Sequence, residues 1–465
     1  MAYGRLRQIW YTRNWSTTRD TLRKWEEADR EMRRKALVGN RIINPMLQPR
    51  RVWDLYSNRV VPWWCTGLGS SSCGDWKWKW PGMLRPISHA WVDEKDRVDV
   101  QTPINRYEWP VPIPKDTSLN LVRIEMLNLQ VEYGWLDVLC LRQEGGLGED
   151  MRRDEWKLDV PTIGAVYHRS SVVIYLSGLG RPLSLKEGDL DSDKCWFRRA
   201  WTLQEVGSSR VIAGDTPDGP LQAECNHGKY ETPLLTRFHE QLQSMSGMSY
   251  TGVFVALKSM QNRVSTNPVD KVAGLAFRLQ SNTIPAYYES ESLEDAWTAL
   301  VNSRHAGVRG MLFCLYSEPG NAGRKWRPSW DQVMTKSLPA YPYSNIDVDW
   351  NKMDEDSCGA GCIEKGLVRG LAVVEGRDRR GELIVKGKDG MEHAFNITAT
   401  HEYPIPEGTY TLICANKWMF QCWVVGRRLP RERFEKVSVL EITNRYEASQ
   451  LEDLNVTKKC RNILV

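Results

Sequence analysis

The sequence lacks a long apolar run, since no stretch approaches the roughly 20 consecutive apolar residues that a membrane-spanning helix requires. Arg5 and Arg7 stand near its N-terminus, and no apolar segment of a secretory signal peptide follows them. Its 11 cysteines are scattered over 465 residues, which favours reduced thiols over a disulfide framework. These absences predict a globular protein of the cytoplasm with no membrane span.

The sequence also lacks the short motifs of common cofactor and metal sites. No GxGxxG fingerprint, phosphate-binding P-loop or HExxH zinc motif occurs, and the glycine-rich residues 145–148 are typical of a loop. Cys358 and Cys362 have Cys-x3-Cys spacing without a second pair at zinc spacing. We therefore expect no metal site and no bound cofactor.

Tryptophan and local positive charge are in excess. The chain holds 21 tryptophans, most of them inside apolar patterns where an indole fills a core, and residues 75–80 alternate tryptophan with lysine like an edge strand. Residues 1–60 hold 14 Lys and Arg against 6 Asp and Glu. Within them, residues 17–37 predict an amphipathic helix in which acidic and basic side chains are interleaved. A solvated helix packed on a domain is thus favoured over an arm that binds nucleic acid or an anionic membrane.

A doubly wound α/β unit is predicted in the middle of the chain. Residues 134–141 and 171–176 are nearly unbroken apolar runs, the pattern of parallel strands that are covered on both faces. A further strand is expected at residues 84–92, and helices are expected at residues 119–131, 155–168 and 195–206. Pro161 either kinks the second of these helices or marks its true start. This alternation predicts a parallel sheet with right-handed crossovers.

The sequence pattern changes along the chain and suggests five regions. We expect a basic, tryptophan-rich N-terminal region at residues 1–83, the α/β core at 84–215, a helical extension at 216–336, a linker at 337–366 and a β domain at 367–465. The extension should contain helices at residues 234–260 and 292–309. The β domain shows short apolar segments of period two between turn residues, which predicts a small antiparallel sandwich or barrel.

Three ordered blocks resemble the signature of the fungal heterokaryon-incompatibility (HET) domain. Residues 88–92 align with the first block, residues 134–143 with the second, and residues 199–205 keep the third, Arg-Ala-Trp-Thr-Leu-Gln-Glu, intact. Two more family-like stretches follow at residues 267–275 and 327–330. The resemblance implies a fungal protein of self/non-self recognition that acts in programmed cell death.

HET domains are in turn similar to TIR domains, which have a flavodoxin-like sheet and a Trp-Cys-x-x-Glu motif on the helix after the fourth strand. In enzymatic TIR domains that glutamate cleaves NAD. Trp201 and Glu205 keep the same spacing, so the resemblance implies Glu205 as the catalytic residue and NAD as the substrate. His89, Val92 and Arg142 depart from the tyrosine, glycine and aspartate of the HET blocks.

The chemistry of NAD cleavage suits one carboxylate in a crevice. The reaction expels neutral nicotinamide and leaves an oxocarbenium-like ribosyl centre, which a carboxylate stabilises without a metal. On the predicted helix, the C-terminal dipole and the neighbouring Trp201 would both raise the pKa of Glu205. Ligands bind beyond the carboxyl ends of parallel strands. The NAD-binding candidates near these ends and on the last helix are His89, Trp91, Asp137, Arg142, Gln143, Ser177, Arg181 and Trp201.

We expect Asp137, Trp201 and Glu205 to meet in one crevice with His89 or Trp91. Each candidate also has a structural interpretation. Glu205 could pair with an arginine such as Arg142 or Arg169, Asp137 could cap a neighbouring loop or pair with Arg199, and His89 could be a hydrogen-bonded core residue.

Two functions follow from these residues. The first is a TIR-like NAD hydrolase (NADase) whose activation kills the cell. The second is a non-enzymatic signalling module that self-associates or recruits another incompatibility protein. A nucleic-acid binder is a weaker third interpretation of the basic N-terminal region.

Overall fold

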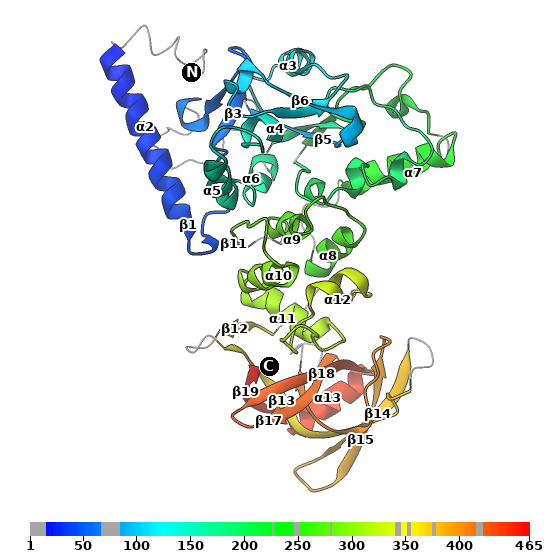
Figure 1. The fold of residues 1–465 in the computed structure, drawn as a ribbon. Coiled ribbons are helices and arrows are strands. Elements are labelled where there is room, and N and C mark those ends of the chain that lie inside the picture. The colour runs from blue at the N-terminus through cyan, green and yellow to red at the C-terminus, as the bar shows by residue number, and fades with distance from the viewer. Residues whose placement is uncertain are drawn as a thin grey trace. The chain divides into compact units, whose positions relative to one another are not determined.

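The computed structural model describes residues 15–66, 84–168, 170–207, 209–225, 227, 229–245, 252–279, 281–339, 346–350, 355–373, 378–414 and 422–465. The chain divides into two compact units (Figure 1). The first comprises Met1–Thr251 and Asn262–Ser292, and the second comprises Gly252–Gln261 and Leu293–Val465. Within the described ranges, no helix is long and apolar enough to cross a membrane. The predicted edge strand at residues 75–80 lies outside them.

A six-stranded sheet of order β10-β9-β5-β8-β3-β4 forms the centre of the first unit. Its strands are β3 (Arg51–Asp54), β4 (Arg59–Pro62), β5 (Leu84–His89), β8 (Tyr133–Leu136), β9 (Ser171–Tyr175) and β10 (Ser209–Ile212). β5, β8, β9 and β10 run parallel, whereas β3 pairs antiparallel with both β8 and β4. Ile87 lies between Leu136 and Val173, and all three are fully buried, as in strands covered on both faces. The unit is therefore mixed α/β.

Helices occupy most of the positions that the apolar periodicity predicts. They are α2 (Trp15–Ala36), α3 (Leu119–Asn128), α5 (Glu149–Asp159) and α6 (Ile163–His168). The break between α5 and α6 falls around Pro161, because proline lacks the N–H that a continuous helix needs. Two later helices, α7 (Pro233–Ser244) and α9 (Val269–Ala276), belong to the same unit.

The strand predicted at residues 134–141 is wrong beyond Leu136. The Asp137 carboxylate accepts a hydrogen bond from the Val138 backbone N–H at 2.8 Å, and the short helix α4 (Asp137–Cys140) begins there. An aspartate at the start of a helix competes with continued strand pairing in this way. As a result, Asp137 lies at the carboxyl end of β8 and not within a strand.

The helix predicted at residues 195–206 does not form. Two short 3-10 turns, Trp196–Arg198 and Trp201–Leu203, stand in its place. The backbone between them pairs with Val264, whose N–H and C=O both bond to it, at 2.6 and 2.9 Å. These bonds to a distant segment replace those of a continuous helix. Glu205 therefore lies on a loop, and the dipole effect expected at a helix C-terminus is absent.

Two smaller sheets complete the first unit. β6 (Arg97–Val100) and β7 (Val111–Pro114) form an antiparallel pair after β5, which the alternation of strand and helix did not predict. β1 (Leu37–Val38), β2 (Arg41–Ile42) and β11 (Ile284–Pro285) form the other. The β6–β7 pair matters for the site, because it brings Arg97 to the cavity beyond the end of β5.

In the described residues of the second unit, four helices precede or join an antiparallel β domain that contains a fifth. The helices are α8 (Val253–Gln261), α10 (Leu293–Asn302), α11 (Ala306–Leu315) and α12 (Trp330–Thr335). The β elements are β12 (Val348–Trp350), β13 (Asp356–Arg369), β14 (Arg379–Lys386), β15 (Glu392–Ala399), β16 (Gly408–Cys414), β17 (Cys422–Leu429), β18 (Arg433–Ile442) and β19 (Lys458–Leu464), with α13 (Arg445–Asp453) before β19. β13 begins inside the predicted linker at residues 337–366, so that linker is shorter than expected.

Strand pairing decides between the two predicted forms of the β domain. The pairings run from β13 through β14, β15, β18 and β17 to β16, which pairs back with β13. The strands thus close into a barrel around fully buried side chains such as Leu383, Leu412 and Trp423.

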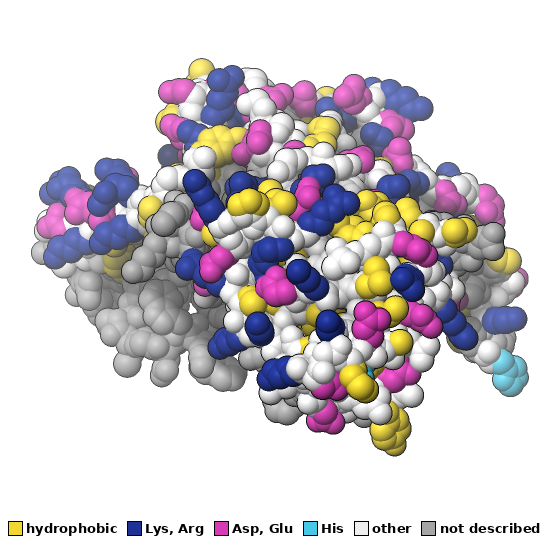
Figure 2. All heavy atoms as spheres, turned by 90° about the horizontal axis from the view of Figure 1, so that it is seen from below, with side chains coloured by type: hydrophobic (Ala, Val, Ile, Leu, Met, Phe, Trp, Pro, Cys, Tyr) yellow, Lys and Arg dark blue, Asp and Glu magenta, His cyan; other side chains and the backbone are white. Residues whose placement is uncertain are grey.

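On the described part of the face in Figure 2, basic and acidic side chains are interspersed, as on a solvated surface.

Candidate functional site

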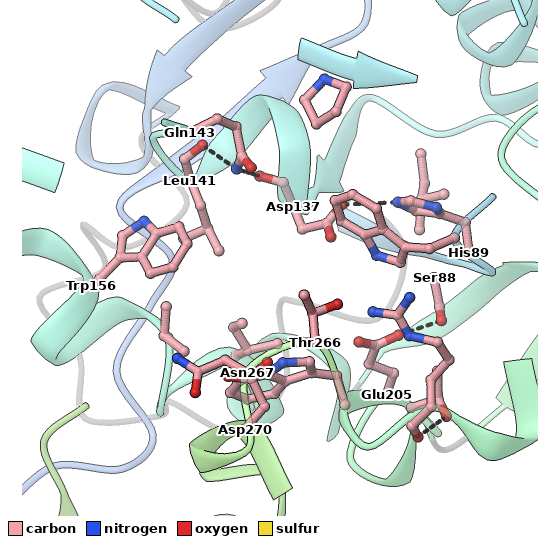
Figure 3. Close-up of a pocket in the computed structure, with 18 of the residues that line it drawn as sticks. Ser88, His89, Asp137, Leu141, Gln143, Trp156, Glu205, Thr266, Asn267 and Asp270 are labelled. Atoms are coloured by element: carbon pink, nitrogen blue, oxygen red, sulfur yellow. Dashed lines mark hydrogen bonds and ion pairs between the residues drawn. The ribbon is translucent and has the colours of Figure 1, made fainter. Parts of the chain in front are cut away.

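A cavity of about 410 Å³ lies in the first unit, at the carboxyl ends of β5 and β8. Figure 3 shows side chains from separate elements around it: Ser88 and His89 at the end of β5, Asp137 after β8, Glu205 on the loop before β10, and Asp270 on α9. The volume is that of a small-molecule site, and parallel strands commonly bind ligands at this end.

The cavity gathers residues that are far apart in the sequence. Six of the predicted site residues line it, namely His89, Trp91, Asp137, Gln143, Trp201 and Glu205. The expected meeting of Asp137, Trp201 and Glu205 with His89 or Trp91 is therefore confirmed, and both of the last two line the cavity. The Gln143 amide donates to the Leu141 carbonyl at 3.0 Å, which orients it at the cavity wall.

Glu205 is held by a directed chain of hydrogen bonds. The Trp196 indole N–H donates to the Ser88 hydroxyl at 2.7 Å, and that hydroxyl donates to the Glu205 carboxylate at 2.5 Å. An indole N–H can only donate, so the Ser88 oxygen must accept from it and turns its own proton toward Glu205. Ser88 and Trp196 are each 1% exposed, which fixes this orientation.

Burial raises the pKa of Glu205 to about 7, and it is the largest influence on this carboxyl. The hydrogen bond from Ser88 opposes the rise, while the negative charge of Asp137 adds to it. The positive charges of His89 and Arg199 act in the lowering direction. Glu205 is therefore poised to exchange a proton near neutral pH, which suits a general acid or base.

His89, which is buried, and Asp137, which is partly buried, form an ion pair beside Glu205. His89 Nε2 lies 3.1 Å from the Asp137 carboxylate, and His89 Nδ1 lies 3.2 Å from the Ala90 carbonyl. Both partners are acceptors, so both ring nitrogens carry a proton. Burial is the largest single influence on His89 and acts to lower its pKa, but the charge and hydrogen bond of Asp137, the Ala90 carbonyl and the charge of Glu205 together raise it. For Asp137, burial acts to raise the pKa, but His89, the Val138 N–H and Arg199 together lower it. The site thus holds an imidazolium and a carboxylate as a fixed pair.

Aromatic rings form another wall of the cavity. The Tyr287 ring centroid lies 6.4 Å from that of Trp201 and 6.3 Å from that of Trp156. The Tyr287 hydroxyl donates to the Asp270 carboxylate at 2.7 Å, and the Trp201 indole also bonds to Asp270. Burial raises the pKa of Asp270, and these two hydrogen bonds oppose the rise. Asp270 therefore positions two aromatic side chains against the space that a ligand would occupy.

Arg142 does not line the cavity. Its guanidinium contacts the carboxylates of Glu108 at 2.9 Å and Glu155 at 3.4 Å. The structural interpretation in which Arg142 pairs with Glu205 is therefore wrong. Arg169, the other arginine considered, lies outside the described residues.

Ser177 and Arg181 also lie away from the cavity lining. The Ser177 hydroxyl bonds to the backbone N–H and C=O of Ser184, which closes the loop after β9. Arg181 pairs with Asp116 at 2.9 Å. Both side chains are thus engaged in holding loops together.

Sequence reasoning did not name several residues that line the site, among them Ser88, Arg97, Trp156, Asp270 and Tyr287, and it considered Arg199 only as a partner of Asp137. Ser88 and Arg199 stand in the first and third HET-like blocks, and Asp270 stands in the stretch 267–275, so the resemblance contained a signal for them. Trp156 and Tyr287 carry no local signal, because their place depends on packing between distant segments.

Among the described residues, no three His, Cys, Asp or Glu side chains gather as a metal would require, and Cys358 and Cys362 lie buried on β13. No family model, no curated protein and no solved structure matches the chain.

Proposed function

We propose that the cavity around Glu205 is the active site of a hydrolase that cleaves NAD between nicotinamide and ribose, in a flavodoxin-like core of the TIR type. The observation that carries the proposal is Glu205 itself, a carboxyl group with a pKa of about 7 at the carboxyl ends of parallel strands, in a cavity of about 410 Å³. The parallel order β8-β5-β9-β10 supports this assignment, since it places the first strand of the core inside the sheet.

The proposed reaction needs one ionised carboxylate. The C1′–N bond breaks, and its electron pair neutralises the pyridinium nitrogen, so that nicotinamide leaves without charge. The Glu205 carboxylate stabilises the positive charge that develops on the ribosyl carbon. Water then attacks that carbon and gives up a proton, which a base with a pKa near 7 accepts and releases to solvent. The products are nicotinamide, ADP-ribose and a proton.

The surroundings of Glu205 supply orientation and charge. Trp201 and Tyr287 offer flat faces to a planar base, and the amides of Gln143 and Asn267 face the same cavity. The His89–Asp137 pair keeps a second carboxylate ionised, which adds negative potential near a developing cation.

A cell-death role follows from the HET resemblance together with this chemistry. Residues of all three HET-like blocks meet at the cavity: Ser88 and His89 from the first, Asp137 from the second, and Trp201 and Glu205 from the third. A signature whose parts converge on one site supports a shared chemical task. Loss of NAD would then be the means by which the protein kills the cell.

A non-enzymatic signalling module is the second candidate, and apolar side chains on α3 favour it. Leu121 is 67% exposed and Ile124 is 48% exposed on this helix. Such side chains suit self-association or a partner protein. In this case Glu205 is structural and the protein leaves NAD intact.

Incubation of the purified protein with NAD, followed by chromatography of the products, separates the two candidates. The enzyme releases nicotinamide and ADP-ribose in equal amounts. A folded protein that leaves NAD unchanged, over a range of concentrations that populates its oligomers, would contradict the proposed function.

A further inference from the structure

Two arginines make cation–π contacts with one tryptophan at the cavity. The guanidinium carbons of Arg97 and Arg199 each lie 5.5 Å from the centroid of the Trp91 ring, and all three side chains line the cavity. Trp91 follows β5, Arg97 begins β6, and Arg199 stands between the two 3-10 turns. Three separate segments thus bring two positive charges to one aromatic ring, which attracts both by its quadrupole.

These two guanidinium groups differ from their neighbours in having no acidic partner. Within the described residues, neither Arg97 nor Arg199 has a carboxylate within 4.0 Å or a side-chain hydrogen bond to protein. By contrast, Arg142, Arg152 and Arg181 each pair with at least one carboxylate. The donors of Arg97 and Arg199 remain available to a ligand, and each guanidinium can bind two oxygens of one phosphate.

Burial makes an anionic ligand favourable at this place. The pKa of Arg199 is lowered mainly because burial strips water from its guanidinium, and the carboxylates of Glu205, Asp137 and Asp270 offset only part of this effect. A phosphate that bonds to Arg199 restores the lost interactions. These carboxylates also repel an anion, so a diphosphate, which can offer one phosphate to each arginine, gains more than a single phosphate.

We propose that Arg97 and Arg199 form a phosphate-binding subsite on Trp91, and that it holds the diphosphate of a nucleotide substrate. The identification of that nucleotide as NAD rests on the proposed function, whereas the binding of a diphosphate at this arginine pair does not. The subsite fixes the orientation of the substrate: its diphosphate lies against Trp91, and the ribosyl carbon can then approach Glu205 in the same cavity. Substrates without phosphate, such as nicotinamide riboside, cannot contact the two arginines in this way and should bind more weakly.

Calorimetry with ADP-ribose and the full-length protein tests the subsite. Arg97→Met and Arg199→Met keep an apolar stem but remove the charge, and Arg181→Met, outside the cavity lining, is the matched control. We expect each cavity variant to weaken ADP-ribose binding at least tenfold and the control to change it less than twofold. Inorganic pyrophosphate should displace ADP-ribose from the unaltered protein, whereas adenosine should not, and this measurement requires no variant.

The outcomes separate the subsite from the enzymatic function. ADP-ribose binding that depends on both arginines supports the subsite even when NAD is not cleaved, in which case only the proposed function fails. Cleavage of NAD by Arg97→Met and Arg199→Met with an unchanged KM would overturn the subsite and leave the function standing. Failure of pyrophosphate to compete with ADP-ribose would overturn the subsite as well.

Discussion

The Ser88 hydroxyl donates a 2.5 Å hydrogen bond to the Glu205 carboxylate, across 117 positions of sequence. The Trp196 indole fixes the direction of this bond, because it donates to the same hydroxyl at 2.7 Å. A donor to a carboxylate favours its charged form. Ser88 therefore holds the pKa of Glu205 below the value that burial alone would produce, and the acidity of the proposed catalytic group depends on a residue of β5.

Replacement of this serine should move the pH dependence of catalysis. In Ser88→Ala the hydrogen bond is lost, the pKa of Glu205 rises above about 7, and the acid limb of NAD cleavage shifts to higher pH. Trp196 also loses its acceptor, which costs about 1–3 kcal/mol of stability. A pH profile of nicotinamide release checks this, with Ser177→Ala outside the cavity as the control. If Ser88→Ala folds and the acid limb of its pH profile does not shift, the proposed role of Ser88 is contradicted.

The raised pKa of Glu205 should also make folding depend on pH. Between its ordinary value of 4.5 and about 7, the folded protein binds this proton more tightly than the unfolded chain. The free energy of unfolding therefore falls as pH rises through this window, by on the order of 3 kcal/mol. Denaturant unfolding at several pH values should show this slope in the wild type, and a smaller slope in Glu205→Gln. Equal slopes would show that Glu205 titrates in its ordinary range.

The meeting of His89 and Asp137 could be predicted, whereas the end of β8 and the conformation around Glu205 could not. Apolar runs locate β5 and β8, and residues at the carboxyl ends of parallel strands share one edge of the sheet. The run at residues 134–141 continues past Leu136, however, because the buried helix α4 is as apolar as a strand. The conformation of the loop before Glu205 depends on backbone hydrogen bonds to Val264, which is distant in the sequence. A local helical pattern in residues 195–206 cannot reveal these bonds. Trp156 and Tyr287 escaped prediction for the same reason.

The pKa of His89 should depend on the Asp137 carboxylate. In Asp137→Asn the burial of the ring remains but the negative charge is gone, so the pKa of His89 should fall from above 6.5 to below it. NMR titration of the histidine ring protons measures this shift, and His89→Gln identifies the signal among the 7 histidines. An unaltered His89 pKa in Asp137→Asn would show that the pair is not electrostatically coupled.

Gly207 should be intolerant of a side chain, because it leads the chain away from Glu205 in close contact with the strand β9. A Cβ at this position would stand 2.3 Å from the Ser170 carbonyl oxygen and 2.6 Å from a Val172 methyl group. Gly207→Ala should therefore destabilise the protein by about 1–3 kcal/mol and lower NAD cleavage through displacement of Glu205. Gly359→Ala, where a Cβ meets nothing within 4 Å, is the control in thermal unfolding. Equal melting temperatures for the two variants would contradict the close packing.

Nicotinamide release by Glu205→Gln, measured beside the wild type, tests the central claim most directly. The amide keeps the size of the side chain and can still accept from Ser88, but it carries no charge and accepts no proton. We predict a melting temperature at least as high as that of the wild type, because the buried charge is gone, and a loss of NAD cleavage on the order of 100-fold or more. A folded Glu205→Gln that releases nicotinamide at the wild-type rate would contradict the assignment of Glu205 as the catalytic residue.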